Sequence, residues 1–280
     1  MNQIKAITFD LDDTLFDRTE AQRRTLRLIM QEFSYLFAGF DEDVVADTFY
    51  KSDEIAMQGW EAGSSFEATR INRCRIFLNA LGLDEKYADE INKTYLRLYP
   101  SINVPVKGSQ SVIDQLMGKF QLGVISNGAP DVQYRKLEKI GIRHLFNCIV
   151  ISDEVGYRKP DPRIFEIALR LLNRKPEECL HIGDSYNADI IGAKKAGFQA
   201  CWLNPDREQM PEVDIKPDFE ISSLEDILAI KSIGFSEYKK QHEQDMKIFD
   251  EIRKKNKGAS LEEVESDIQK AVATVRREKH

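Results

Sequence analysis

The feature of this sequence that most restricts its fold is an alternation of short apolar runs with longer amphipathic segments. Each run has the near-continuous apolar character of a strand that is buried on both faces of a parallel sheet. The runs lie at residues 4–9, 121–126, 148–152, 179–182 and 200–203, with a weaker one at 219–221. Residues 109–119, 131–140 and 162–173 carry apolar side chains at helical spacing between these runs. Alternating strands and helices predict an α/β fold with a doubly wound, Rossmann-like parallel sheet.

Residues 17–99 interrupt this alternation because they have the pattern of four helices without a strand between them. Gly82 ends the third of these helices and Pro100 stops the fourth. An insert after the first strand lies over the carboxyl end of the sheet, where open α/β folds bind ligands. We therefore expect an inserted α-helical cap at 17–99 and a core made of 1–16 and 100–235.

Residues 236–280 differ from both regions. From residue 237 onward, 11 Lys and Arg stand against 10 Asp and Glu, and no run has the pattern of a strand. Ser260 and Glu263 match a capping box, followed by an apolar stripe at helical spacing. We expect a charged C-terminal helical extension, which is a candidate for self-association or for partner binding.

The composition argues against several partners. A net charge of −7, from 40 Lys and Arg against 47 Asp and Glu, does not fit the basic surface of a nucleic-acid-binding protein. No stretch approaches the roughly 20 apolar residues that span a bilayer, and the first residues do not resemble a signal peptide. The 4 cysteines are scattered and indicate free thiols in a reducing compartment. We expect a cytoplasmic protein that binds neither nucleic acid nor membrane.

Polar clusters follow the predicted strands. Residues 10–14 (DLDDT) come directly after the first strand, and residues 126–128 (SNG) end the second. Lys159 lies beside prolines after the third strand, and residues 183–189 (GDSYNAD) end the fourth. Taken singly, each cluster is more often a helix cap, a solvated turn or a surface lysine. Because the carboxyl ends of parallel strands meet at one edge of a sheet, together they predict one site.

In this order the clusters match the DxDxT, Ser/Thr, Lys and GDxxxxD motifs, and the chain resembles the haloacid dehalogenase-like (HAD) hydrolase superfamily. The resemblance covers about residues 1–230 and points to the phosphatase branch with a C1-type helical cap. It implies that Asp10 attacks phosphorus to form an aspartyl-phosphate and that Asp12 is the general acid and base. It also implies that Ser126, the Asn127 backbone and Lys159 bind the transferring phosphoryl group.

The resemblance further implies a Mg²⁺ ion. Its ligands would be the carboxylates of Asp10 and Asp184 and the backbone carbonyl of Asp12, with Asp189 acting directly or through water. Arg18 follows the catalytic turn and is a candidate for binding a second anionic group of the substrate. A simple salt bridge at the surface or hinge explains Arg18 equally well.

The expected activity is Mg²⁺-dependent hydrolysis of a small phosphorylated metabolite, either a nucleoside monophosphate or a sugar phosphate. A 2-haloacid dehalogenase is one alternative, but Asp12 argues against it because displacement of halide needs no proton from a general acid. A phosphomutase is a second alternative, which the sequence leaves open. A non-catalytic binding protein is the least favoured, because the four motif residues Asp10, Asp12, Lys159 and Asp184 are intact.

Overall fold

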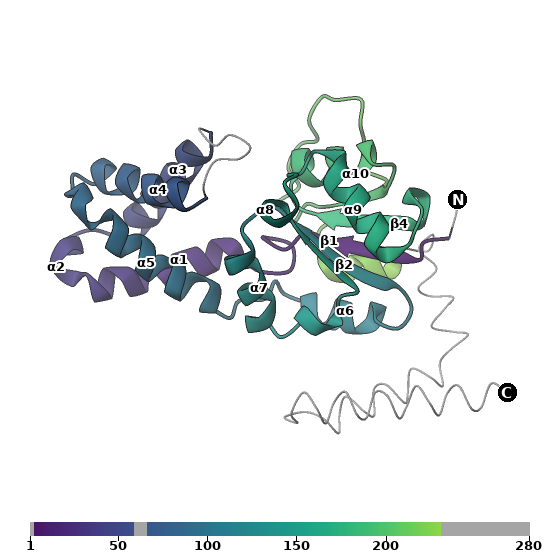
Figure 1. Ribbon diagram of the computed structural model, residues 1–280, viewed down its shortest axis with the longest axis horizontal. Coiled ribbons are helices and arrows are strands. Elements are labelled where there is room, and N and C mark those ends of the chain that lie inside the picture. The colour runs from purple at the N-terminus through teal and green to yellow at the C-terminus, as the bar shows by residue number, and fades with distance from the viewer. Residues whose placement is uncertain (1–2, 59–65, 231–280) are drawn as a thin grey trace, which may run out of the picture. The chain divides into compact units, whose positions relative to one another are not determined.

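A computed structural model describes residues 3–58 and 66–230 and shows a parallel β-sheet (Figure 1). Within these residues the sheet has six strands in the order β3-β2-β1-β4-β5-β6, and each neighbouring pair is parallel. The strands are β1 (Ala6–Phe9), β2 (Gln121–Ser126), β3 (Cys148–Ile151), β4 (Cys179–Gly183), β5 (Gln199–Leu203) and β6 (Phe219–Ile221). The α/β fold class predicted from the apolar runs is confirmed.

The chain reverses its direction across the sheet between β1 and β4. It moves outward from β1 to β2 and β3 and then returns to β4 on the other side of β1. The connections contain α6 (Ser109–Leu116), α7 (Pro130–Lys139), α8 (Ser152–Val155), α9 (Pro162–Leu172), the π-helix η5 (Tyr186–Ile191) and α10 (Gly192–Lys195). Figure 1 shows α9 and α10 on one face of the strands and α6 on the other. Such a reversal opens a crevice at the carboxyl ends of β1 and β4.

Helix α9 fixes the loop that precedes it. Asp161 caps the helix by accepting a hydrogen bond from the backbone N–H of Arg163, and Pro162 occupies the first turn. Its apolar face is buried in the core with Ile125 of β2 and Val150 of β3. A fully buried large apolar side chain contributes about 1.5–3 kcal/mol, so this face anchors the segment that contains Lys159.

Between β1 and α6, the described residues form five α-helices that are grouped together in Figure 1. They are α1 (Arg18–Glu32), α2 (Ser34–Phe37), α3 (Glu42–Gln58), α4 (Phe66–Ala80) and α5 (Ala88–Leu98). Their shared core includes the aromatic rings of Phe49, Phe77 and Tyr95, with the Phe49 and Tyr95 rings stacked 5.0 Å apart. The pattern predicted four of these helices, and the structure adds the short α2.

Two chain segments connect these helices to the sheet and run side by side. The Asp17 N–H donates to the Val104 carbonyl, and the Val106 N–H donates to the Leu15 carbonyl, each at 2.9 Å. Short 3₁₀ helices complete the described elements: η1 (Glu85–Tyr87), η2 (Tyr99–Ser101), η3 (Arg143–Leu145), η4 (Pro176–Glu178) and η6 (Leu224–Ala229).

The stretch Asn2–Ile227 forms one compact unit that contains both the sheet and the inserted helices. The predicted extension at 236–280 lies outside the described residues. In the part of the chain that is described, no helix is both long enough and apolar enough to cross a bilayer.

Candidate active site

Asp10 stands where β1 ends, at the crevice between β1 and β4. Its backbone N–H donates to the Ile182 carbonyl at 2.8 Å, which continues the pairing of β1 with β4. The carboxylate is 8% exposed, and its Oδ1 accepts a hydrogen bond from Lys159 Nζ at 2.6 Å. Burial raises the pKa of Asp10 well above its ordinary value, although the Lys159 charge opposes this shift. The predicted nucleophile is therefore paired with the predicted phosphoryl-binding lysine.

Lys159 is held from both ends. Its Nζ also donates to Asp189 Oδ1 at 2.6 Å. The Asn127 side chain accepts from the Lys159 backbone N–H at 2.8 Å and donates to the Lys159 carbonyl at 3.0 Å. The amide of Asn127 thus fixes the lysine loop against the end of β2, and this leaves the Asn127 backbone at the strand end as the part predicted to face a phosphoryl group.

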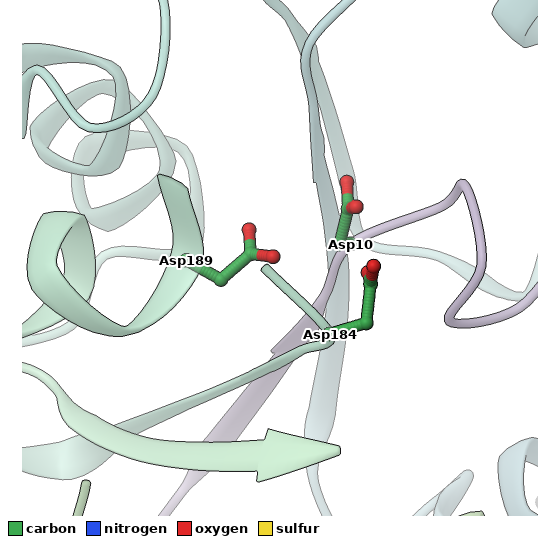
Figure 2. A group of neighbouring side chains, drawn as sticks. All are labelled: Asp10, Asp184 and Asp189. Carbon is green, nitrogen blue, oxygen red and sulfur yellow. The ribbon is translucent and has the colours of Figure 1, made fainter. Parts of the chain in front are cut away.

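Three carboxylates gather at this edge. Asp184 follows β4, Asp189 projects from η5, and their oxygens lie with one from Asp10 within 4.8 Å of one another (Figure 2). Thr14 Oγ1 donates to Asp184 Oδ1 at 2.9 Å, which gives that hydroxyl a structural role in the turn. The Ser185 N–H donates to Asp189 Oδ2 at 3.0 Å. This set of oxygen donors can hold a hard divalent cation.

The electrostatics of these carboxylates also suit a cation. Burial and the negative charges of Asp189 and Asp13 raise the pKa of Asp184 to about 7. Burial opposes ionisation of Asp189 as well, but the Lys159 ammonium and the hydrogen bond with His181 together outweigh burial and lower the pKa of Asp189 to about 2. The Lys159 ammonium thus pairs with two of the three carboxylates, Asp10 and Asp189, and a bound divalent ion would relieve the remaining repulsion with Asp184.

His181 is buried beneath this cluster. Its Nδ1 lies 2.9 Å from Thr8 Oγ1, and its Nε2 lies 3.2 Å from Asp189 Oδ1. Burial lowers the pKa of His181, which favours the neutral ring. This histidine is packed and hydrogen-bonded within the core, where it also orients Asp189.

Asp12 faces α7, and its carboxylate has hydrogen-bond partners different from those of Asp10. Its Oδ1 accepts from Lys136 Nζ at 2.6 Å, and its Oδ2 accepts from Gln133 Nε2 at 3.0 Å. Burial raises the pKa of Asp12, but the charges of Lys136 and Arg18 outweigh burial and place the pKa below its ordinary value. Gln133 Nε2 also donates to Ser126 Oγ at 2.7 Å, so one amide connects the Asp12 turn to the end of β2.

Sequence reasoning missed Gln133 and Lys136. Both are 2% exposed although they are polar, and the Lys136 ammonium lies 4.6 Å from the centre of the Tyr99 ring. The available signal was their position on the buried face of α7 beside Val132 and Leu137. A buried face that carries a lysine and an amide needs a polar partner, and here Asp12 supplies it.

Arg18 forms the salt bridge considered for it, and its binding of a second anionic group stays a prediction. Its Nη2 donates to Asp53 Oδ2 at 2.8 Å, which joins the start of α1 to α3. Its side chain also lines a cavity together with Asp12 and Asn127. The salt bridge is present, and the guanidinium borders the space next to the predicted general acid.

The comparisons with known proteins agree with this geometry. A family model described as haloacid dehalogenase-like hydrolase matches residues 4–197. The chain belongs to that family. The expected HAD membership and enzyme class are thereby confirmed, and the protein is a HAD-like phosphoester hydrolase.

Relatives of this HAD-like chain include phosphatases and dehalogenases. A glyceraldehyde 3-phosphate phosphatase from Methanopyrus kandleri is 31% identical over 246 residues, which cover 81% of this chain and 97% of that protein. The solved structure of the putative HAD-hydrolase YfnB from Bacillus subtilis, bound to magnesium, matches with a TM-score of 0.71 and 27% identity over 82% of this chain and 99% of that one. A 2-haloacid dehalogenase from Pseudomonas syringae matches with a TM-score of 0.57 and 26% identity, over 82% of this chain and 99% of that one.

Proposed function

We propose that this protein is a Mg²⁺-dependent phosphatase that hydrolyses a small phosphorylated metabolite through an aspartyl-phosphate on Asp10. The observation that carries the proposal is the contact of one buried ammonium, that of Lys159, with both Asp10 and Asp189. A phosphoryl group that approaches Asp10 would meet this ammonium, so its charge would be stabilised next to the attacking carboxylate.

The residues present fit a magnesium ion. Asp10 and Asp184 would hold it with their carboxylates and Asp12 with its backbone carbonyl, while Asp189 would act through water because Lys159, His181 and Ser185 already occupy its oxygens. When bound, Mg²⁺ would supply positive charge to the phosphoryl oxygens. The YfnB structure, which carries magnesium, supports this choice of metal.

In the first step Asp10 forms a bond to phosphorus while the bond from phosphorus to the leaving oxygen breaks. Lys159, the Ser126 hydroxyl and the Asn127 N–H would receive the charge of the phosphoryl oxygens. Asp12 would give a proton to the leaving oxygen and then take one from the water that hydrolyses the intermediate. A bound phosphoryl dianion would bring negative charge close to Asp12. This charge would oppose that of Lys136 and raise the pKa of Asp12, so that Asp12 could carry the proton it gives to the leaving oxygen.

The same considerations weigh against a dehalogenase. Attack on carbon with loss of halide produces no alkoxide that must be protonated. A dehalogenase would therefore not need a general acid such as Asp12, which Gln133 and Lys136 hold in place. The similarity to a Methanopyrus kandleri phosphatase over most of the chain also favours phosphoester chemistry.

We also infer the division of labour in the chain. The paired linkers near residues 16–18 and 100–107 support a helical cap at 17–99 over a core of 1–16 and 100–235. Closure of such a cap excludes water and selects small metabolites over phosphoproteins. The 4 cysteines, all within the described residues, are free and buried, which supports the cytoplasm as the location.

The test is a panel of phosphorylated metabolites and p-nitrophenyl phosphate, assayed with and without Mg²⁺. Asp10→Asn should lower turnover by about 10³-fold or more, because an amide cannot form the acyl-phosphate. Asp47→Asn, on the exposed surface of α3, is the matched control and should retain activity. Mg²⁺-independent turnover, or near-wild-type turnover in Asp10→Asn after deamidation is excluded, would contradict the proposal. Release of chloride from 2-chloropropionate in place of phosphate would favour the dehalogenase.

A further inference from the structure

A cavity of about 190 Å³ opens beside Asp12 and the Asn127–Gly128 turn. Residues of α1, α3, α4, α5 and α7 line it, together with Arg158 from the loop before α9. Beyond the phosphoryl group, the space in this conformation suits a short chain of atoms.

The wall of this cavity is strongly positive. Among the residues that the structure describes, five basic side chains and two acidic ones line it, an excess of three positive charges: Arg18, Arg70, Arg73, Lys136 and Arg158 against Asp12 and Asp53. Arg70 forms an ion pair with Asp131, outside the lining, and discounting Arg70 still leaves an excess of two. The whole chain has a net charge of −7, so the charge of the cavity wall is opposite in sign to that of the molecule. Concave sites with low-dielectric walls concentrate such a field on a bound ligand.

Part of this charge is fixed in place by α3 and α4. Asp53 accepts from Arg18 at 2.8 Å with one oxygen and from Arg73 at 3.1 Å with the other. Arg73 is 7% exposed, and its guanidinium stacks 4.4 Å from the centre of the Tyr95 ring. One carboxylate shared by two guanidiniums leaves a net positive charge, and Arg73 keeps Asp53 and Arg18 aligned.

Arg158 adds a guanidinium from the core. It directly precedes Lys159, whose backbone is held by the Asn127 side chain, so its position relative to the phosphoryl site is constrained. Burial and the positive charge of Arg18 lower the pKa of Arg158, although Asp53 opposes this shift. Two guanidiniums that repel each other across a cavity are stabilised by an anion placed between them.

We propose that this cavity is a subsite for a second anionic group of the substrate, a carboxylate or a second phosphate on a short carbon chain, bound by Arg18 and Arg158. The inference rests on the proposed phosphatase function and narrows its substrates. It favours phosphorylated acids and bisphosphates over neutral sugar phosphates and nucleosides, because the second anion would neutralise the excess charge of the wall.

The test compares substrates that differ only in the second group. 3-Phosphoglycerate and glycerol 3-phosphate have the same three-carbon chain, with a carboxylate in one and a hydroxymethyl group in the other. Propane-1,3-diol bisphosphate and its monophosphate form the second pair. We expect kcat/KM to be higher for the anionic member of at least one pair by about tenfold or more, as charged hydrogen bonds provide. The pair that responds identifies the anion.

Substitution of the two arginines locates the subsite. The preference is measured as the ratio of kcat/KM between the two substrates of a pair. Arg158→Gln and Arg18→Gln should each bring this ratio closer to one. Arg23→Gln on the exposed face of α1 and Arg170→Gln on the exposed face of α9 are matched controls and should keep the ratio. Because Arg18 also binds Asp53, the melting temperature is measured for every variant. If Arg18→Gln does not fold, the conclusion is drawn from Arg158→Gln alone.

The possible failures are distinguishable. If p-nitrophenyl phosphate and every probe resist hydrolysis, the proposed function is overturned and the subsite with it. If the wild type hydrolyses p-nitrophenyl phosphate with Mg²⁺ but shows no preference within either pair, only the subsite is overturned. A preference that survives Arg158→Gln in a folded protein would also overturn it, because the anion would then be bound elsewhere.

Discussion

At the scale of single residues, the Lys136 ammonium lies 2.6 Å from the Asp12 carboxylate although the lysine side chain is 2% exposed. Lys136→Gln leaves the partly buried Asp12 carboxylate without its hydrogen-bonded cation, and loss of one partner of a fully buried ion pair, about 3–5 kcal/mol, is the upper bound for the cost. We expect a lower free energy of unfolding and a loss of kcat by about tenfold or more, because Asp12 is no longer held in place. Denaturant unfolding and steady-state kinetics would measure both, with the exposed Lys139→Gln as the control on the same helix.

The same variant makes a prediction about pH. The positive charges of Lys136 and Arg18 outweigh burial and lower the pKa of Asp12, so removing Lys136 should raise that pKa. Hydrolysis of the intermediate needs ionised Asp12, and a higher pKa means that ionisation is lost at a higher pH. The acidic limb of the kcat profile should therefore move upward in Lys136→Gln and stay near its wild-type position in Lys136→Arg. An unmoved limb in both variants would show that Asp12 does not control it.

The cysteine thiols give a second prediction at this scale. Burial raises the pKa of Cys148 and of Cys179 to about 12. At pH 8 a thiol with that pKa is ionised to about 1 part in 10⁴, and the thiolate is the reactive form. We expect slow reaction with dithionitrobenzoate in the native state and rapid reaction of all four cysteines in guanidinium chloride. Above the unfolded-state pKa of about 8.5, the unfolded chain loses thiol protons that the folded chain keeps, so stability should fall as pH rises.

At the scale of elements, the end of β4 has no room for a side chain. A Cβ atom at Gly183 would lie 2.3 Å from Asp189 Cγ, and Lys159, His181 and Ser185 already hold that carboxylate. Gly183→Ala should therefore displace Asp189, lowering Mg²⁺ affinity and kcat/KM by about tenfold or more.

A matched glycine separates this effect from general destabilisation. Gly141 has a φ of +78° and nothing within 4 Å of a Cβ atom, so Gly141→Ala strains the backbone without crowding the site. We expect Gly141→Ala to lose stability and keep its metal affinity, measured by calorimetric titration of Mg²⁺. Equal metal affinity in Gly183→Ala and the wild type would contradict the role given to Asp189.

The elements themselves could be predicted because their signals are local. Each strand has a continuous apolar run, and the helices have apolar stripes that end at Gly or Pro, as at Gly82 and Pro100. The break between α1 and α2 was missed because it occurs at Phe33, whose backbone leaves the helical region without a Gly, Pro or Asn to mark it. Apolar periodicity continues across that point and conceals the interruption.

The site could be predicted only where residues follow strand ends. Asp10 and Asp184 lie close together because the carboxyl ends of parallel strands meet at one edge of the sheet. Lys136 and Asp12 are 124 residues apart in sequence, and Arg158 meets Arg18 only through the packing of the inserted helices near the sheet. A helical pattern shows which face of α7 is buried, but not which carboxylate that face will meet.

At the scale of the whole molecule, the charge around the cavity is opposite in sign to the net charge of the chain. The chain has a net charge of −7, yet the described lining of the cavity beside Asp12 is positive, and its basic residues come from four separate stretches of sequence. Because charges separated by more than about 8 Å are screened at physiological salt, the acidic surface does little to an anion already inside the cavity. Net charge therefore argues against a nucleic-acid partner without arguing against an anionic metabolite.

The final prediction concerns residues 236–280, which lie outside the described structure. Every residue that we assign to catalysis, metal or substrate belongs to the compact unit Asn2–Ile227. The extension carries an apolar stripe at Leu261, Val264, Ile268, Val272 and Val275, and an isolated amphipathic helix of this kind is marginal unless it packs on another surface. A chain truncated after Ser236 should keep kcat/KM within about twofold of the full chain, and any loss should appear as a lower melting temperature or a changed oligomeric state, measured by light scattering. A truncated protein that remains folded but no longer hydrolyses phosphate esters would show that the extension supplies a functional element to the site.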